Sequence, residues 1–188
     1  MDSGEAYFGL NNYQKAAEEY KEAGTLAKKL KRTKQQDEAS QYPKLAEQVI
    51  LADEALLAGE YQKAQELYLA ARGMSVQTGN AGLSYIESQL DRTIGYVRIF
   101  DLMAQGEHKE EYGNLEGAIA LYKEAKEQSA ALYYKEGKEE ALKLQMAAEE
   151  ALEQQKMEEK ARLQEQINEE VASLAIERSK KLLRKKEP

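Results

Sequence analysis

Apolar and small side chains recur along this chain in one fixed order, with polar residues between them. The order is a large residue, a small one, an aromatic one and a second small one, separated by three, four and three positions. These steps follow the 3.6-residue turn of an α-helix, so the four positions share one face. We call this pattern the packing phrase, because small residues let a neighbouring helix approach closely while the aromatic ring fills the space beside them.

The packing phrase occurs three times: Tyr13-Ala16-Tyr20-Ala23, Tyr61-Ala64-Tyr68-Ala71 and Leu115-Ala118-Tyr122-Ala125. It resembles the second helix of a tetratricopeptide repeat. Gly59-Glu60 and Gly113-Asn114 are similar to the turn before that helix, and Asn11-Asn12 is a weaker version. The resemblance covers roughly residues 1–130 and implies a solenoid of about three helical hairpins. The phrase recurs after 48 and then 54 residues, whereas the family unit has about 34, so we expect longer helices.

Composition agrees with an all-α fold. Ala, Glu, Lys, Leu and Gln dominate, and only two prolines occur, Pro43 and Pro188. The pattern predicts helices over 13–40, from Pro43 to Gly59, over 61–78, over 83–112 and over 115–136, with a break at 79–82. Gly137 is a further candidate break. We therefore expect a repeat domain over residues 1–137 and a single long helix over 138–188.

The predicted C-terminal helix has two parts. Ala141, Leu142, Met146 and Ala148 suit a cap over the last repeat, since a solenoid otherwise leaves an apolar face in water. Beyond Leu152 the apolar residues thin to a narrow stripe that suits a coiled coil or a docking helix. Its middle is acidic and its end is basic, so it could pair antiparallel with a second copy.

Several classes of protein are disfavoured. The chain has no cysteine, hence no disulfide or thiolate site, and this fits the cytoplasm and a bacterial cell surface equally. It has no apolar run long enough to span a bilayer and no signal peptide. A net charge of −7 argues against a nucleic-acid partner, and the basic residues from Lys28 to Lys34 and from Arg178 to Lys186 favour solvated helix ends. Because the chain opens inside an expected helix, we expect an excised fragment of a longer protein.

The sequence offers little for catalysis. His108 is the only histidine, and with Glu111 it has helical spacing, but a metal site needs further ligands. Paired carboxylates such as Glu18 and Glu19 suit a solvated helix surface. No phosphate-binding loop or nucleophile motif occurs. We expect no enzymatic activity, no cofactor and no metal.

The tetratricopeptide resemblance implies a partner-binding groove lined by the first helix of each unit. The Lys, Arg and Asn residues with which some members clamp a C-terminal carboxylate are absent. Acidic and apolar residues at these positions favour a basic amphipathic peptide or helix. The implied groove residues are Glu5, Phe8, Val49, Asp53, Leu56, Leu57, Phe100, Met103, Glu107, Glu110 and Glu111.

The leading hypothesis is thus a non-catalytic protein-interaction module that binds a partner through this groove or its long C-terminal helix. The alternative is a regulatory or linker segment of a larger, membrane-anchored or signalling protein whose catalytic domain lies outside this sequence. Self-association through the C-terminal helix is compatible with both.

Overall fold

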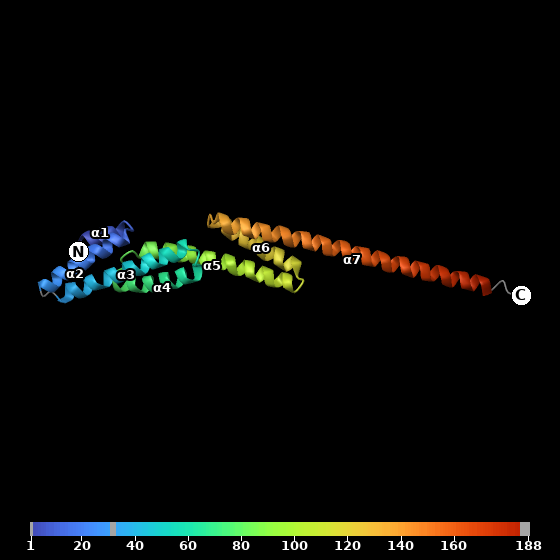
Figure 1. Ribbon diagram of the computed structural model, residues 1–188, viewed down its shortest axis with the longest axis horizontal. Helices are drawn as coiled ribbons and strands as arrows, with labels where there is room; N and C mark the ends of the chain where they lie inside the picture. Colours follow the sequence, from blue (N-terminus) through green and yellow to red (C-terminus); the bar gives the residue numbers. More distant parts are fainter. Residues whose placement is uncertain (1, 31–32, 185–188) are drawn as a thin grey trace. The chain divides into compact units, whose positions relative to one another are not determined.

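A computed structural model describes residues 2–30 and 33–184 of the chain. This part is all-helical and has no strand, which confirms the all-α prediction. Of the predicted basic residues, Lys31, Arg32, Lys185 and Lys186 lie outside the described residues. Seven helices follow one another (Figure 1): α1 Asp2–Gly9, α2 Tyr13–Lys29, α3 Thr33–Leu57, α4 Tyr61–Gln77, α5 Leu83–Glu111, α6 Leu115–Ala131 and α7 Lys135–Arg184.

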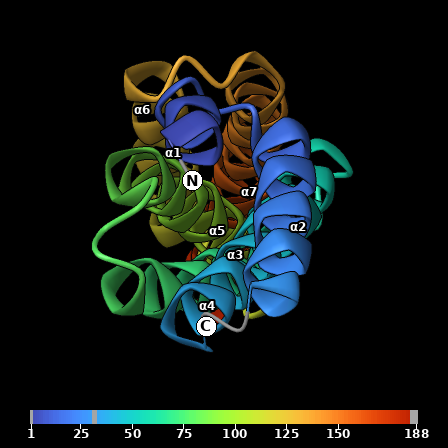
Figure 2. The same ribbon diagram turned by 90° about the vertical axis from the view of Figure 1, so that its left-hand side faces the viewer.

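The chain divides into two compact units. Unit 1 comprises Met1–Asp101 with Gln128–Tyr134, and unit 2 comprises Leu102–Glu127 with Lys135–Pro188. This division differs from the predicted boundary at 137, because α5 and α6 each contribute to both units. In unit 1, α1 packs on α2, α2 on α3 and α3 on α4 (Figure 2).

One hydrogen-bonded turn recurs at the junctions that precede α2, α4, α6 and α7. After α3, Gly59 N–H donates to the Leu56 carbonyl and Glu60 N–H to the Ala55 carbonyl. These bonds satisfy carbonyls that the helix end leaves free, and they require one residue with positive φ. The residue with positive φ is Asn11 before α2, Gly59 before α4, Gly113 before α6 and Tyr133 before α7.

The small and aromatic positions of the packing phrase are core residues, as predicted, except Ala23, which is half-buried. Tyr20, Tyr68 and Tyr122 are fully buried, and each phrase contributes at least one fully buried alanine. A Cβ added at Gly4 would lie 2.7 Å from the Tyr20 ring, and one added at Gly106 would lie 2.4 Å from the Tyr122 ring. Each of these two rings therefore packs directly against a helix backbone at a position where only glycine, which has no Cβ, leaves room for the ring.

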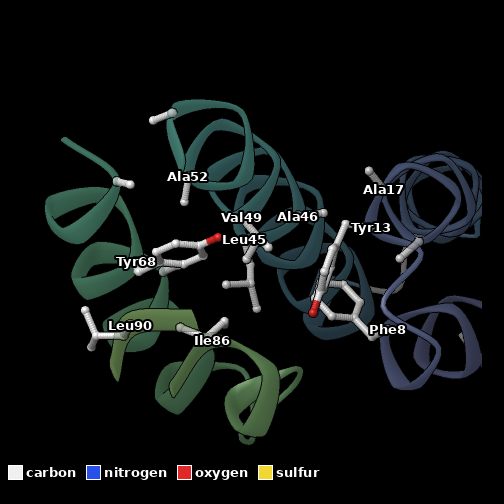
Figure 3. Close-up of a cluster of buried hydrophobic side chains, with 14 of the residues drawn as sticks. Phe8, Tyr13, Ala17, Leu45, Ala46, Val49, Ala52, Tyr68, Ile86 and Leu90 are labelled. Carbon is white, nitrogen blue, oxygen red and sulfur yellow. The ribbon is translucent and has the colours of Figure 1, made fainter. Parts of the chain in front are cut away.

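The buried core of unit 1 contains side chains from each of the helices α1 to α5. Tyr68 extends from α4 toward Leu45 and Val49 of α3, and Ile86 of α5 closes the other side (Figure 3). Phe8 packs edge-on against Tyr13, with ring centroids 5.3 Å apart. The aromatic residues thus fill the space that the small residues leave between helices.

Two predicted helix ends are wrong near Pro43. The second helix ends at Lys29 rather than near residue 40, and α3 begins at Thr33 and runs through Pro43. A proline inside a helix leaves one backbone hydrogen bond unformed. The residue before it, Tyr42, makes tertiary contacts that favour the helix at this position. Tyr42 stacks on Tyr20 with ring centroids 4.0 Å apart, and its hydroxyl donates to the Thr78 carbonyl.

The predicted break at Gly137 is also wrong. The chain turns earlier, at Tyr133, whose φ of 55° supplies the left-handed residue without a glycine. Helix α6 accordingly ends at Ala131 and α7 begins at Lys135, so that Gly137 lies in its first turn. The break over 79–82 and the single long helix that follows it are confirmed by α5.

Candidate functional site

Three of the predicted groove residues have no surface to offer a partner. Phe8, Val49 and Met103 are between 0% and 5% exposed. Each lies on the helix face that meets its neighbours, because that face carries the largest apolar side chains. The assignment of these three to an accessible groove is therefore wrong: they belong to the core.

Asp53 is occupied by the protein itself. Its Oδ1 accepts hydrogen bonds from the hydroxyl of Tyr68 and, at 2.9 Å, from that of Tyr85. Burial and this carboxylate raise the pKa of Tyr85 to about 12, and the same causes raise the pKa of Tyr68. Both phenols therefore stay protonated and hold Asp53 in place. Asp53 thus links α3 to α4 and α5. Its carboxylate accepts hydrogen bonds within the fold, so it has a structural role and was not correctly described as a free carboxylate of the groove.

In unit 2, carboxylates also lie close to a buried tyrosine. Burial raises the pKa of Tyr122, and the carboxylates of Glu110 and Glu107 raise it further. Glu110 is half-buried, whereas Glu107 and Glu111 are exposed. Met103 and these three glutamates belong to unit 2, and the other predicted groove residues belong to unit 1. The two sets are therefore described separately.

The side chain of Glu5 lies outside the described residues, and Leu56, Leu57 and Phe100 of unit 1 are more accessible. Leu56 is half-buried, Leu57 is 89% exposed and Phe100 is 42% exposed. Of the predicted set, Phe100 alone lines a solvent-open recess in unit 1. This recess has a volume of about 440 Å³ and lies where the turn between α3 and α4 faces α5. Its lining residues are Gly59, Glu60, Tyr61, Gln62, Lys63, Val97, Phe100 and Asp101.

An aromatic cluster forms the apolar part of this site. The Tyr61 and Phe100 rings stack with centroids 5.3 Å apart, and Tyr96 meets Tyr61 edge-on at 5.0 Å. Tyr134 packs on Tyr96 at 4.6 Å, and the Tyr61 hydroxyl donates to the Tyr134 hydroxyl. The four rings fix one another, so the Phe100 face is presented on a rigid base. We call these four residues the aromatic cluster.

Charged groups border the recess on two sides. Glu60 forms an ion pair with Lys63, one turn along α4. Asp101 is exposed beside Phe100 on α5. The two carboxylates of Glu60 and Asp101 outnumber the single ammonium group of Lys63, so the border carries a net negative charge. The recess therefore combines an apolar floor with an acidic edge, which suits an apolar side chain flanked by basic residues.

Three members of the aromatic cluster were not predicted as site residues. Tyr61 is the first residue of a packing phrase, and its expected role was packing alone. Tyr96 and Tyr134 had no predicted role. The spacing of Tyr96 and Phe100 was the available signal, because residues four apart share a helix face. Tyr134 carried no such signal, since its position depends on the turn before α7.

His108 packs on Tyr112 with ring centroids 4.7 Å apart. Within the described ranges, no group of three or more His, Cys, Asp or Glu side chains is placed to hold a metal ion. Over the same ranges, none of the helices has a stretch apolar enough to cross a bilayer.

No protein-family model, no curated protein and no solved structure matches this chain significantly. The tetratricopeptide resemblance thus continues to rest on the residues of the packing phrase and its turns.

Proposed function

We propose that this chain is a non-catalytic protein-interaction module whose recess in unit 1 binds an apolar anchor residue of a basic amphipathic helix or peptide. The observation that carries the proposal is the exposed Phe100 face, held on the aromatic cluster and bordered by acidic side chains. Interfaces gain most of their affinity from a few anchors that enter such recesses. Basic residues beside the anchor would meet Glu60 and Asp101.

The tetratricopeptide resemblance supports the same class of function, since it implies a scaffold that presents a binding face. The packing phrases build the scaffold, and their rings at Tyr20, Tyr68 and Tyr122 are buried in core contacts. The exposed groups that remain near the recess are therefore the ones available to a partner. In this proposal the partner-binding site is smaller than the predicted groove and consists of Phe100 and its neighbours on α4 and α5.

The test uses a synthetic helical peptide that carries leucines on one face, lysines on the other and a single tryptophan. The chain has no tryptophan, so the fluorescence reports on the peptide alone. We expect saturable binding to the full chain. Phe100→Ala should raise Kd at least tenfold, because a lost hot-spot anchor costs about 2 kcal/mol or more.

Two controls make this test decisive. A peptide with glutamate in place of each lysine should bind more weakly, since it would meet Glu60 and Asp101 with like charge. Tyr112→Ala removes an aromatic side chain that is 76% exposed and lies outside the recess, and it should leave Kd unchanged. Equal binding to the Phe100→Ala variant, or equal binding of the acidic peptide, would refute the proposed site.

A further inference from the structure

The residue that precedes each packing phrase holds the same position in the fold. The backbone carbonyls of Asn12, Glu60 and Asn114 each accept a hydrogen bond from the N–H of the first alanine of their phrase, at 3.0, 2.9 and 3.0 Å. Each residue therefore lies at the N-terminus of its helix, where the first N–H groups of the helix need acceptors. Because the backbone contacts agree, the three side chains can be compared directly.

Two of these side chains cap their helix and the third does not. Asn12 Oδ1 accepts a hydrogen bond from the Lys15 N–H at 3.3 Å. Asn114 Oδ1 accepts one from the Gly117 N–H at 2.9 Å. Asparagine is among the residues that cap helices best. Glu60 makes no side-chain capping hydrogen bond, so α4 lacks an interaction that α2 and α6 have.

The carboxylate of Glu60 belongs to the recess instead. Glu60 and Lys63 both line the recess, and Lys63 Nζ lies 2.5 Å from Glu60 Oε2. The side chains of Glu60 and Lys63 are 50% and 64% exposed, so a partner can reach both of them. An ion pair at such a surface is weak, because water competes for each charge. A cation carried by a partner can therefore replace Lys63 at this carboxylate.

We propose that Glu60 is the residue by which the recess selects a basic partner, and that Lys63 pairs with it until a lysine or arginine of the partner takes its place. The inference rests on the proposed function and identifies the border charge that decides specificity. A residue that breaks a local rule which the rest of the chain follows is expected at a functional site. Here the broken rule is the helix cap that the other two phrases keep.

The first test gives α4 the residue that the other two phrases use. Glu60→Asn should raise the melting temperature, because asparagine can cap the first turn of α4. The same variant should raise the Kd of the peptide of leucines, lysines and one tryptophan about threefold or more, because the carboxylate is lost. A more stable protein that binds less well cannot be explained by damage to the fold.

The matched control makes the reverse exchange at α6. Asn114 has the same backbone contact but does not line the recess. Asn114→Glu should lower the melting temperature, because the cap is lost, and should leave the Kd of the peptide unchanged. The two exchanges together separate the effect of capping on stability from the effect of the carboxylate on binding.

The second test removes the competing cation. Lys63→Met should lower the Kd of the same peptide about two- to fivefold, since Lys63 no longer competes for Glu60. In a chain that also carries Glu60→Asn, this gain should shrink. Lys143→Met is the control, because Lys143 pairs with Glu140 at the same i,i+3 spacing on α7 and the chain loses the same charge. It should leave the Kd unchanged.

The outcomes distinguish this inference from the proposed function. If Phe100→Ala weakens binding and Glu60→Asn does not, the recess remains the binding site and the role of Glu60 is overturned. If neither variant changes the Kd, the recess is not the binding site and both proposals are overturned. Equal tightening by Lys63→Met and Lys143→Met would show an effect of net charge and overturn the competition. Weaker binding with Glu60→Asn and tighter binding with Lys63→Met alone would support the proposal.

Discussion

The two parts of α7, residues 135–152 and residues 153–178, differ in burial: the first contains buried residues, whereas every residue of the second is exposed. In the first part, the fully buried residues include Ala141 and Ala148, which are small. In the second part, Leu163, Ile167 and Leu174 are large and are more than half exposed. Large side chains are exposed in the first part as well, where Leu142 and Met146, which were predicted to cap the last repeat, are 40% and 59% exposed.

The position of α6 explains this difference. Small residues on α7 let α6 approach closely, so they are buried because a partner helix is present. Leu163, Ile167 and Leu174 lie past the pair formed by Lys156 and Glu116, where that partner ends. Burial along this helix therefore follows the reach of its neighbour. The same reasoning applies to Tyr122, whose ring is buried because Gly106 leaves room for it.

The largest effect should come from cutting α7 at two places. A chain that ends at Tyr134 lacks all of α7 and uncovers the face of α6 on which α7 packs. A chain that ends at Lys156 lacks only the exposed part. We expect the first to melt about 10 °C or more below the natural chain, since each kcal/mol changes Tm by about 2–4 °C at this size.

The second truncation should leave the melting temperature of the packed helices nearly unchanged when both are measured by circular dichroism at low protein concentration. Similar losses in the two truncated chains would mean that the exposed part supports the fold. No loss in either would remove the capping role of α7.

A smaller effect should come from overpacking α6. Ala118 is fully buried, so Ala118→Leu must displace its neighbours and should lower the free energy of unfolding by about 1–3 kcal/mol. Ala120→Leu makes the same change at an exposed position of the same helix and should stay within about 0.5 kcal/mol of the natural chain. Urea unfolding measures both. Equal effects at the two positions would contradict the assigned buried face.

The smallest effect concerns alkaline pH and the Asp53 contacts. The pKa of Tyr85 is about 12 in the folded chain, whereas an unfolded tyrosine ionises near about 10. Unfolding therefore releases a proton between these values, and stability that is fully present below pH 10 is lost as the pH rises toward 12. In Tyr85→Phe this decline should be shallower. An identical decline in the variant and the natural chain would argue against the contact with Asp53.

Much of the helical layout could be predicted from the sequence. The phrase positions at Ala64, Tyr68 and Tyr122 are buried as their spacing indicates, and the turns at Gly59 and Gly113 occur where glycine permits positive φ. These features are local, because helix periodicity and turn chemistry depend on neighbouring residues. The helix from Pro43 was predicted, but its start at Thr33 was not, since the stacking of Tyr42 on Tyr20 is a tertiary contact.

The candidate site was less predictable for the same reason. Phe8 and Met103 match a groove pattern by position, but their burial depends on which helices pack against them. Phe100 was predicted, yet the recess beside it is lined from two distant parts of the sequence, by residues 59–63 and by Val97, Phe100 and Asp101. Spacing identifies a face, whereas a recess needs several elements to converge.

The most direct measurement is hydrogen–deuterium exchange of the full chain in dilute solution. We predict slow exchange of the amides near Ala141 and Ala148, which are buried. The amides from Leu163 to Leu174 should exchange faster, since this part of α7 is exposed. Equal protection of the two parts would contradict the division of α7 into a packed part and an exposed part.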